Sequence, residues 1–105
     1  MRSRRTPGRQ VVNVGSRLDG GTVAGLRPRL HEAVDRGEGD LIVDMSGLEM
    51  IDAAGLGVLV GTHRRALRAD RRLVLRDVPP RVMRVLAITR LHRVIPVEMP
   101  EAAVA

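Results

Sequence analysis

The chain has 105 residues, the length of one domain with a single core, and 44% of them are hydrophobic, a share that excludes a disordered protein. It has no cysteine, which excludes disulfides and thiolate metal sites, and no apolar run long enough to span a membrane. The net charge is +6, but the absence of aromatic residues leaves no platform for base stacking. We therefore expect a cytoplasmic protein without a cofactor, a specific nucleic-acid target or a membrane-inserted segment.

The first 22 residues predict a basic tail, a strand and a turn. Residues 1–9 are rich in arginine, and we expect them to form a flexible tail ahead of a domain over residues 10–105. The valines of residues 10–18 predict a strand with an irregularity at Gly15. Residues 19–22, Asp-Gly-Gly-Thr, predict a turn.

A helix is predicted next. Apolar residues recur at spacings of three and four over residues 23–34, which is the period of one helix face. Pro28 lacks the N–H group that a helix interior needs. We therefore expect the helix to start near Ala24 or Gly25, with Pro28 in its first turn, and to end at Gly37.

A buried strand, a loop and a second helix follow. Residues 41–43, Leu-Ile-Val, predict a central strand buried on both faces, and Ser46-Gly47 begins a loop. Asp52 precedes the second helical pattern as a candidate N-cap. Gly57 and Gly61 lie four apart on this helix and weaken it, which predicts close packing against another backbone. The pattern predicts that Leu56, Leu59, Val60 and Leu67 face the core and that Arg64, Arg65 and Arg68 face solvent.

The last third of the chain predicts a strand, a helix and an edge strand. Residues 73–75, Leu-Val-Leu, predict a strand, and Pro79-Pro80 opens a third helix with apolar periodicity. Residues 93–97 predict a final strand at a sheet edge, because Pro96 has no N–H to donate to a ladder. For residues 100–105 a helical turn and an irregular end both stay open. The alternation of strands and helices indicates an α/β sheet with substantial parallel pairing.

The segment over residues 41–60, LIVDMSGLEMIDAAGLGVLV, resembles the signature of STAS domains. That signature is an apolar strand, a short loop, and Asp-Ser-(Ser, Thr or Ala)-Gly-Leu-Gly at the start of a helix. Residues 16–22 are similar to the family's Gly-Glu-Leu-Asp-x-x-Thr segment, and residues 78–91 to its third helix and the next turn. The resemblance implies a single STAS domain of the anti-sigma factor antagonist family. Such a domain has a mixed sheet of four to five strands and about three to four helices.

The resemblance implies a regulatory binding protein and no enzymatic activity. Anti-sigma factor antagonists bind an anti-sigma factor, which is also a serine kinase, and so free a sigma factor. The kinase phosphorylates the residue after the motif aspartate, which is Asp52 here, and the phosphate breaks the complex. A phosphate adds about −1.5 to −2 charges. Beside Asp52 and Asp19 that charge would repel an acidic partner, although the helix N-terminus could accept it.

The sequence departs from the family pattern at the phosphorylated position. Asp52 is followed by Ala53 and Ala54, which have no hydroxyl group, so the phosphoacceptor position at Ala53 is vacant. Three explanations stay open: a natural antagonist that binds constitutively, a paralogue that belongs to another assembly, or an engineered serine-to-alanine change.

Other residues around the motif also bear on the switch. Ser46 and Thr62 are alternative phosphoacceptors, although Ser46 is better explained by a local bond to the backbone and Thr62 lies well inside the helix. The family's Gly-acidic pair is Ser16-Arg17 here, and its glycine after the third helix is Arg90. The first change alters the charge beside the expected binding surface.

The resemblance predicts a partner-binding surface around the motif. For Asp19 and Asp52 the residues alone favour another explanation, that each carboxylate caps a turn or a helix, and the resemblance reverses this for Asp52. Gly55 would allow close approach of another backbone. A second hypothesis is a STAS subunit of a lipid-transport or stress-sensing complex, in which other STAS proteins would be partners. The predicted surface comprises Asp19, Ser46, Asp52, Ala53, Ala54, Gly55 and Leu56.

Three further patterns in the sequence have simple structural explanations. The glycines of residues 55–61 lack the spacing of a nucleotide-binding loop, so close helix packing is the better explanation. The arginines of residues 64–72 predict a solvated face, or alternatively a docking surface for an acidic partner. The three histidines have no spacing typical of metal ligands, and we predict neither a metal site nor catalytic residues.

Overall fold

The computed structural model describes residues 9–98 and has an α/β architecture. Four strands form the main sheet in the order β1-β3-β5-β6, and β2 and β4 form a separate pair. The strands are β1 (Arg9–Asn13), β2 (Arg17–Leu18), β3 (Asp40–Asp44), β4 (Met50–Ile51), β5 (Arg72–Arg76) and β6 (Val97–Glu98). The helices are α1 (Val23–Arg36), α2 (Ala53–Arg68), α3 (Pro80–Ile88) and the short 3-10 helix η1 (Leu91–Arg93).

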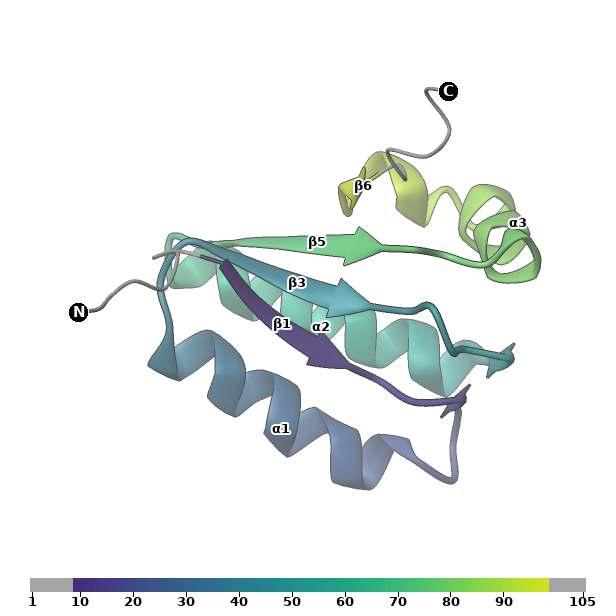
Figure 1. Ribbon diagram of the computed structural model, residues 1–105, viewed down its shortest axis with the longest axis horizontal. Coiled ribbons are helices and arrows are strands. Elements are labelled where there is room, and N and C mark those ends of the chain that lie inside the picture. The colour runs from purple at the N-terminus through teal and green to yellow at the C-terminus, as the bar shows by residue number, and fades with distance from the viewer. Residues whose placement is uncertain (1–8, 99–105) are drawn as a thin grey trace.

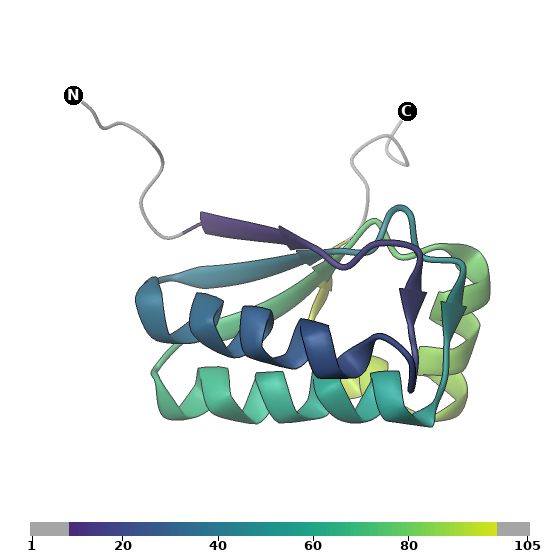
Figure 2. The same ribbon diagram turned by 90° about the horizontal axis from the view of Figure 1, so that it is seen from below.

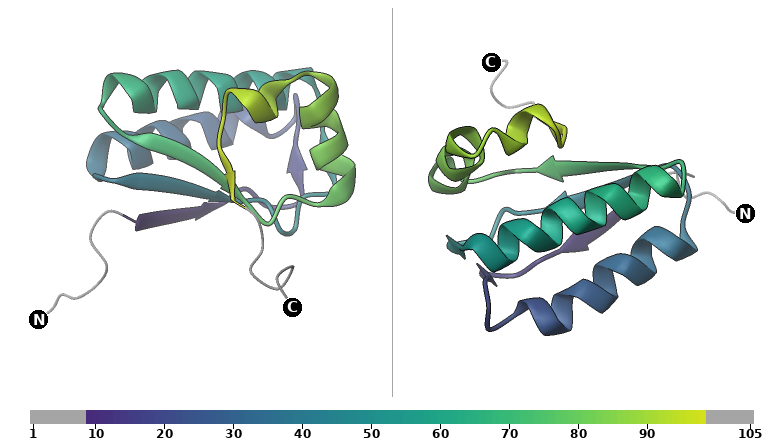
Figure 3. Two further views of the ribbon diagram at one scale, coloured as in Figure 1. Left: turned by 90° about the horizontal axis from the view of Figure 1, so that it is seen from above. Right: turned by 180° about the vertical axis from the view of Figure 1, so that it is seen from behind.

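The helices α1 and α2 lie side by side on one face of the main sheet (Figures 1 and 2). The α3 helix lies beyond the carboxyl end of β5 (Figure 1). The β2–β4 pair stands at the same end of the molecule, next to the first turns of α1 and α2 (Figures 2 and 3). The loops that carry the predicted binding residues therefore gather at one end of the sheet.

The central strand β3 has the burial that the sequence predicts. Its residues 41–43 are fully buried, because β3 lies between β1 and β5 in the main sheet. The predicted α/β class and the four-stranded sheet are confirmed. All strand pairings among residues 9–98 are parallel, as the alternation of strands and helices indicated, whereas the resemblance implied a mixed sheet. Each connection between successive strands of the main sheet passes through a helix, and this crossover keeps the strands parallel.

The hydrophobic core fills the space between the main sheet and the helices. Without aromatic rings it consists of aliphatic side chains and one methionine, so many small contacts must fill the space. Its members are Val14, Leu18, Leu26, Leu30, Ala33, Val34, Leu41, Val43, Met45, Leu48, Val58, Leu59, Ala66, Leu73, Leu75, Val82, Leu86 and Ile95.

The first helix starts earlier than the sequence predicts. It begins at Val23, so Pro28 is its sixth residue and does not lie in the first turn. Pro28 cannot donate to the carbonyl group of Ala24, four residues before it. Both residues are exposed, and water can therefore satisfy that carbonyl. The predicted end at Gly37 is confirmed by its position as the C-cap.

Both ends of the described chain differ from the prediction. The predicted strand over residues 93–97 is wrong, because η1 occupies residues 91–93 and β6 is only Val97–Glu98. The predicted edge position is confirmed, and Pro96 contributes its carbonyl oxygen, which accepts from the Leu75 N–H at 2.9 Å. The predicted tail lies outside the described residues except for Arg9, where β1 begins, and so does the segment over residues 100–105.

Candidate functional site

Asp52 joins the loop before α1 to the start of α2. Its Oδ1 accepts a hydrogen bond from the Gly55 N–H at 3.0 Å, and its Oδ2 accepts from the Gly20 N–H at 3.2 Å. The Asp52 N–H donates to the carbonyl oxygen of Leu18 at 3.3 Å. The bonds from Gly55 and Gly20 lower the pKa of the Asp52 carboxyl group. The predicted N-cap is therefore confirmed, and the same carboxylate fixes the position of the loop.

Asp19 is directed into the chain and holds the turn before α1. It is only 4% exposed, and its Oδ1 accepts from the Gly21 N–H at 2.9 Å. Its Oδ2 lies 2.7 Å from a terminal guanidinium nitrogen of Arg17. Asp19 therefore caps the turn, which is one of the two roles that the sequence left open for it. The side chain that faces solvent at this point is Arg17, which is 58% exposed.

Ala53 and Ala54 are the first two residues of α2, and both are exposed. A hydroxyl group at position 53 would therefore be accessible to a kinase. Gly55 is buried, and a Cβ atom built on it would overlap the carbonyl oxygen of Leu18. The close backbone approach at Gly55 thus occurs within the chain, where the start of α2 packs against β2. Leu56 is partly buried and packs against the core.

The two alternative phosphoacceptors have different accessibility. Ser46 is exposed, and its backbone N–H donates to Oδ1 of Asp44 at 3.0 Å. Thr62 is fully buried, and its hydroxyl donates to the carbonyl oxygen of Val58 at 2.8 Å. Of these two hydroxyls only that of Ser46 can be reached by another protein without unfolding of α2.

Gly57 and Gly61 of α2 do not pack against another backbone as the sequence predicted. A Cβ atom at Gly57 or Gly61 would have no heavy atom within 4 Å other than those of its own helix and neighbours. The predicted packing of another backbone against these two glycines is therefore wrong. The segment over residues 55–61 is helical throughout, so it offers no glycine-rich loop for a nucleotide phosphate.

The inward face of α2 is rotated from the predicted one. Leu59 is fully buried as predicted, but Leu67 is 57% exposed, so its predicted core position is wrong. Thr62 and His63 take part in the buried face instead, and the periodicity of apolar residues gave no sign of them because both are polar. Arg64 and Arg68 are exposed as predicted.

Arg71 is a buried residue that the sequence pattern did not reveal. It belongs to the arginine run that predicted a solvated surface, yet it is only 5% exposed. Its guanidinium donates to the carbonyl oxygens of Ala33 and Val34 at the end of α1, and to that of Gly39, at 2.8–2.9 Å. It also donates to Oε1 of Gln10 in β1 at 3.0 Å. The partners are backbone carbonyls and one amide, and carbonyl acceptors leave no signature in a sequence.

Taken together, the fold and this site define a small α/β domain with an exposed loop-and-helix surface. Within residues 9–98 no group of three His, Cys, Asp or Glu side chains is arranged to hold a metal ion. No helix in that range is long and apolar enough to cross a membrane. The small side chains of Ala53 and Ala54 at the start of α2 are exposed, and such a surface suits contact with another macromolecule.

Known proteins with similar sequences identify the family. A family model described as "Mlab, STAS domain" matches residues 1–97. The chain is 34% identical to the Anti-sigma-B factor antagonist of Staphylococcus aureus (strain NCTC 8325 / PS 47) over 80 residues, which are 76% of this chain and 74% of that protein. It is 26% identical to the Anti-sigma F factor antagonist of Paenibacillus polymyxa over 88 residues, or 83% and 75% of the two chains. The chain therefore belongs to the STAS domain family of anti-sigma factor antagonists.

Solved structures show the same fold. The crystal structure of an anti-sigma factor antagonist from Mycobacterium paratuberculosis matches with a TM-score of 0.77 and 23% identity, covering 95% of this chain and 85% of that chain. The unphosphorylated form of the anti-sigma factor antagonist SpoIIAA matches with a TM-score of 0.73 and 22% identity, covering 97% and 90%. The comparisons indicate no enzyme family.

Proposed function

We propose that this chain is a cytoplasmic anti-sigma factor antagonist that binds an anti-sigma factor of the serine-kinase type and so frees a sigma factor. The observation that carries the proposal is the family match, which includes a relative at 34% identity named as an Anti-sigma-B factor antagonist. The proposed contact surface comprises the start of α2 and the loops next to it, where Ser46, Ala53 and Ala54 are exposed and Asp52 and Leu56 are partly buried. Asp19 and Gly55 are buried, so their proposed role is to position the backbone of this surface.

The second part of the proposal is that this antagonist lacks the usual off-switch. Ala53 follows the capping Asp52 and is exposed, but it has no oxygen to accept a phosphate. The complex should therefore persist when the kinase is supplied with ATP. A serine at position 53 should restore the switch, because a phosphate there would add about −1.5 to −2 charges next to the Asp52 carboxylate.

The test is binding to the kinase-type anti-sigma factor encoded nearest to this chain's gene, measured by calorimetry with and without ATP, together with intact-mass analysis. We expect the wild type to bind in both conditions with no gain of phosphate. The Ala53→Ser variant should bind without ATP, gain one phosphate with ATP and then dissociate. A phosphate on the wild type would assign the switch to another hydroxyl, with Ser46 as the accessible candidate.

A matched pair of variants tests the surface itself. Ala54 and Ala24 are both exposed and are both the second residue of a helix, in α2 and α1 respectively. A glutamate is compatible with either position, because an acidic side chain suits a helix N-terminus. Ala54→Glu should weaken binding of the anti-sigma factor strongly, whereas Ala24→Glu should leave it unchanged. Equal binding by both variants would remove the start of α2 from the contact surface.

A second candidate function is a constitutive STAS subunit of a larger assembly, such as a lipid-transport or stress-sensing complex. Two observations favour it: the vacant phosphoacceptor position at Ala53 and the family model, whose description does not name an antagonist. This function predicts stable co-purification with an ATPase or with other STAS proteins. Failure to bind any kinase-type anti-sigma factor, with such co-purification, would favour the second candidate over the first.

A further inference from the structure

Positive charge is concentrated in the last part of the described chain. Residues 9–77 contain eleven arginines and ten acidic residues, whereas residues 78–97 contain four arginines and no acidic residue. These four are Arg81, Arg84, Arg90 and Arg93, and all are exposed. None of them forms an ion pair with another residue in the range 9–98. The α3–η1 region therefore presents four arginines that have no ion-pair partner within residues 9–98.

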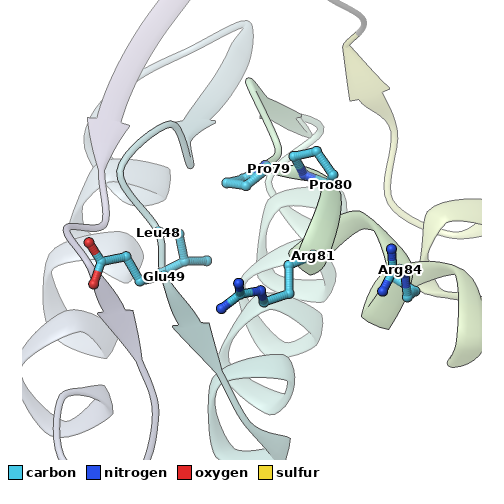
Figure 4. Close-up of a pocket in the computed structure, with 6 residues that line it drawn as sticks. All are labelled: Leu48, Glu49, Pro79, Pro80, Arg81 and Arg84. Carbon is cyan, nitrogen blue, oxygen red and sulfur yellow. The ribbon is translucent and has the colours of Figure 1, made fainter.

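A groove lies beside two of these arginines. It has a volume of about 500 Å³ and lies between the start of α3 and the segment that precedes β4 (Figure 4). This volume is within the range of sites that hold ligands. Leu48, Pro79 and Pro80 give the groove an apolar lining. Figure 4 shows the Arg81 guanidinium pointing toward the Leu48–Glu49 segment, while the Glu49 carboxylate points away from α3.

The outer face of α3 continues this surface. Arg81, Arg84 and Ile88 are spaced by three and four residues, so they lie on one face of the helix. Ile88 is 76% exposed, the highest value among the exposed large hydrophobic residues of the described chain. Val82 and Leu86 lie on the buried face of the same helix. The exposed face thus combines an apolar side chain with two unpaired cations.

We propose that this surface, defined as the groove together with Arg81, Arg84 and Ile88, is a docking site for an acidic segment of a partner protein. Carboxylates of the segment would pair with the two guanidinium groups, which suit bidentate contacts with carboxylates. Apolar side chains of the segment would contact Ile88 and the proline-lined groove. Arginine is enriched among the interface residues that contribute most to binding.

A protein segment fits these features better than a nucleic acid or a membrane does. The chain has no aromatic residue on which bases could stack. A groove accepts a chain segment, as in the helix-in-groove mode of recognition, whereas a bilayer presents a broad surface. The docking site shares no lining residue with the proposed antagonist surface, so it does not rest on the proposed function.

The test uses a fluorescein-labelled synthetic peptide that is rich in glutamate and has leucine at every third or fourth position. Its binding to the full chain is followed by fluorescence anisotropy at an ionic strength of about 0.15 M. The variant Arg81→Glu/Arg84→Glu should lose about tenfold or more in affinity. The matched control is Arg64→Glu/Arg68→Glu, which makes the same charge change at two exposed arginines of α2. The control should bind within about twofold of wild type.

Nuclear magnetic resonance locates the peptide on the labelled protein. The amide signals of Leu48, Glu49 and Arg81 should shift on titration, and those of Ala53 and Ala54 should not. Shifts confined to Ala53 and Ala54 would overturn the docking site. The Ala54→Glu variant should still bind the peptide, so failure of the antagonist function and failure of this site give different results.

Three other outcomes would also overturn the proposal. Equal losses in the two double variants would show that affinity follows net charge and not this surface. Tighter binding of a DNA duplex, or of vesicles of phosphatidylcholine and phosphatidylglycerol, with the same dependence on Arg81 and Arg84 would assign the surface to that class of partner. Equal thermal unfolding midpoints for the wild type and the variants would show that all of them are folded. If the folded wild type then does not bind the peptide, the site is rejected.

Discussion

The described chain contains two regions that use arginine differently. Residues 9–77 hold all the ion pairs found among residues 9–98, for example Arg17–Asp19, Arg65–Asp35 and Arg72–Asp40. Residues 78–97 have as high a density of arginine but no acidic residue. In the first region several arginines have acidic partners within the fold, although exposed ones such as Arg64 and Arg68 do not. In the second region none of the four arginines has an ion-pair partner among residues 9–98. Exposed ion pairs contribute little to stability, so the difference concerns recognition more than folding.

Arg71 is the buried arginine of the described chain, and its replacement should have the largest effect on the free energy of unfolding. Its guanidinium connects the end of α1 to β1 through carbonyl acceptors and Gln10. The Arg71→Met variant keeps an unbranched chain but leaves those buried acceptors without donors. We expect it to lower the free energy of unfolding by about 3–5 kcal/mol. Urea denaturation followed by circular dichroism measures this.

The control for this prediction is Arg68→Met. Arg68 is exposed and forms no ion pair with any residue of the range 9–98. We expect a change of less than about 0.5 kcal/mol in its free energy of unfolding. Similar losses in the two variants would mean that the buried hydrogen bonds of Arg71 do not set its importance.

Asp44 provides a pH-dependent test of the first region. The backbone N–H of Ser46 donates to its Oδ1 and the Asn13 amide to its Oδ2, at 3.0 and 3.3 Å. These bonds, that from Ser46 first, lower the pKa of Asp44 below its ordinary value of 3.8. A carboxyl group with a lowered folded-state pKa adds stability above its unfolded-state pKa, and this stability is lost as the pH falls through the folded-state pKa.

The expected result is a drop in the thermal unfolding midpoint of the wild type below about pH 4. The Asp44→Asn variant should be less stable than wild type near neutral pH and should lose less stability on acidification. Parallel curves of unfolding midpoint against pH for the two proteins would show that the Asp44 carboxylate does not contribute. Asp35 and Asp52 also have lowered pKa values, so the variant should retain part of the pH dependence.

The sequence predicted the elements of the fold better than the roles of individual side chains. The buried run at residues 41–43, the N-cap at Asp52 and the start of α3 at Pro80 were all predictable, because each follows from local chemistry. The burial of Arg71 was not predictable, since its partners are carbonyl groups contributed by β3's neighbouring loop and by α1. The prediction failed for Arg71 because its burial depends on contacts with segments that are distant in the sequence.

The candidate site shows the same division. The motif located the start of α2, and the exposure of Ala53 and Ala54 agrees with a binding surface. Gly55 and Gly57 differ by two positions and have the same intrinsic preference, yet only Gly55 packs against the backbone of Leu18. The different surroundings of these two glycines follow from tertiary contacts and could not be predicted from the periodicity of the sequence. The ion pair between Arg17 and Asp19 was not predicted either.

Arg90 offers a test in the second region with a smaller expected effect. Its φ is 64°, in the left-handed region where a side chain costs energy and glycine does not. The Arg90→Gly variant relieves that strain but increases the entropy of the unfolded chain. We expect a net gain of about 0.5 kcal/mol in the free energy of unfolding, whereas Arg90→Ala, which retains the Cβ atom, should give no gain. Equal stability of the two variants in urea denaturation would contradict this explanation.

The smallest effect on the free energy of unfolding is expected at Arg81 and Arg84, the two arginines of the proposed docking site. Arg81 lies in the first turn of α3, which contains no acidic residue, although the positive end of the helix dipole favours acidic side chains there. The Arg81→Glu/Arg84→Glu variant should therefore change the free energy of unfolding by less than about 0.5 kcal/mol. Because the helix dipole favours a glutamate at position 81, we expect this change to be a small increase. Urea denaturation beside the Arg71→Met variant measures both regions on one scale. A loss comparable to that of Arg71→Met would show that these arginines serve the fold. A neutral result, combined with lost binding of the acidic peptide, would show that they serve a partner, because their charge would then contribute to binding and not to the stability of the fold.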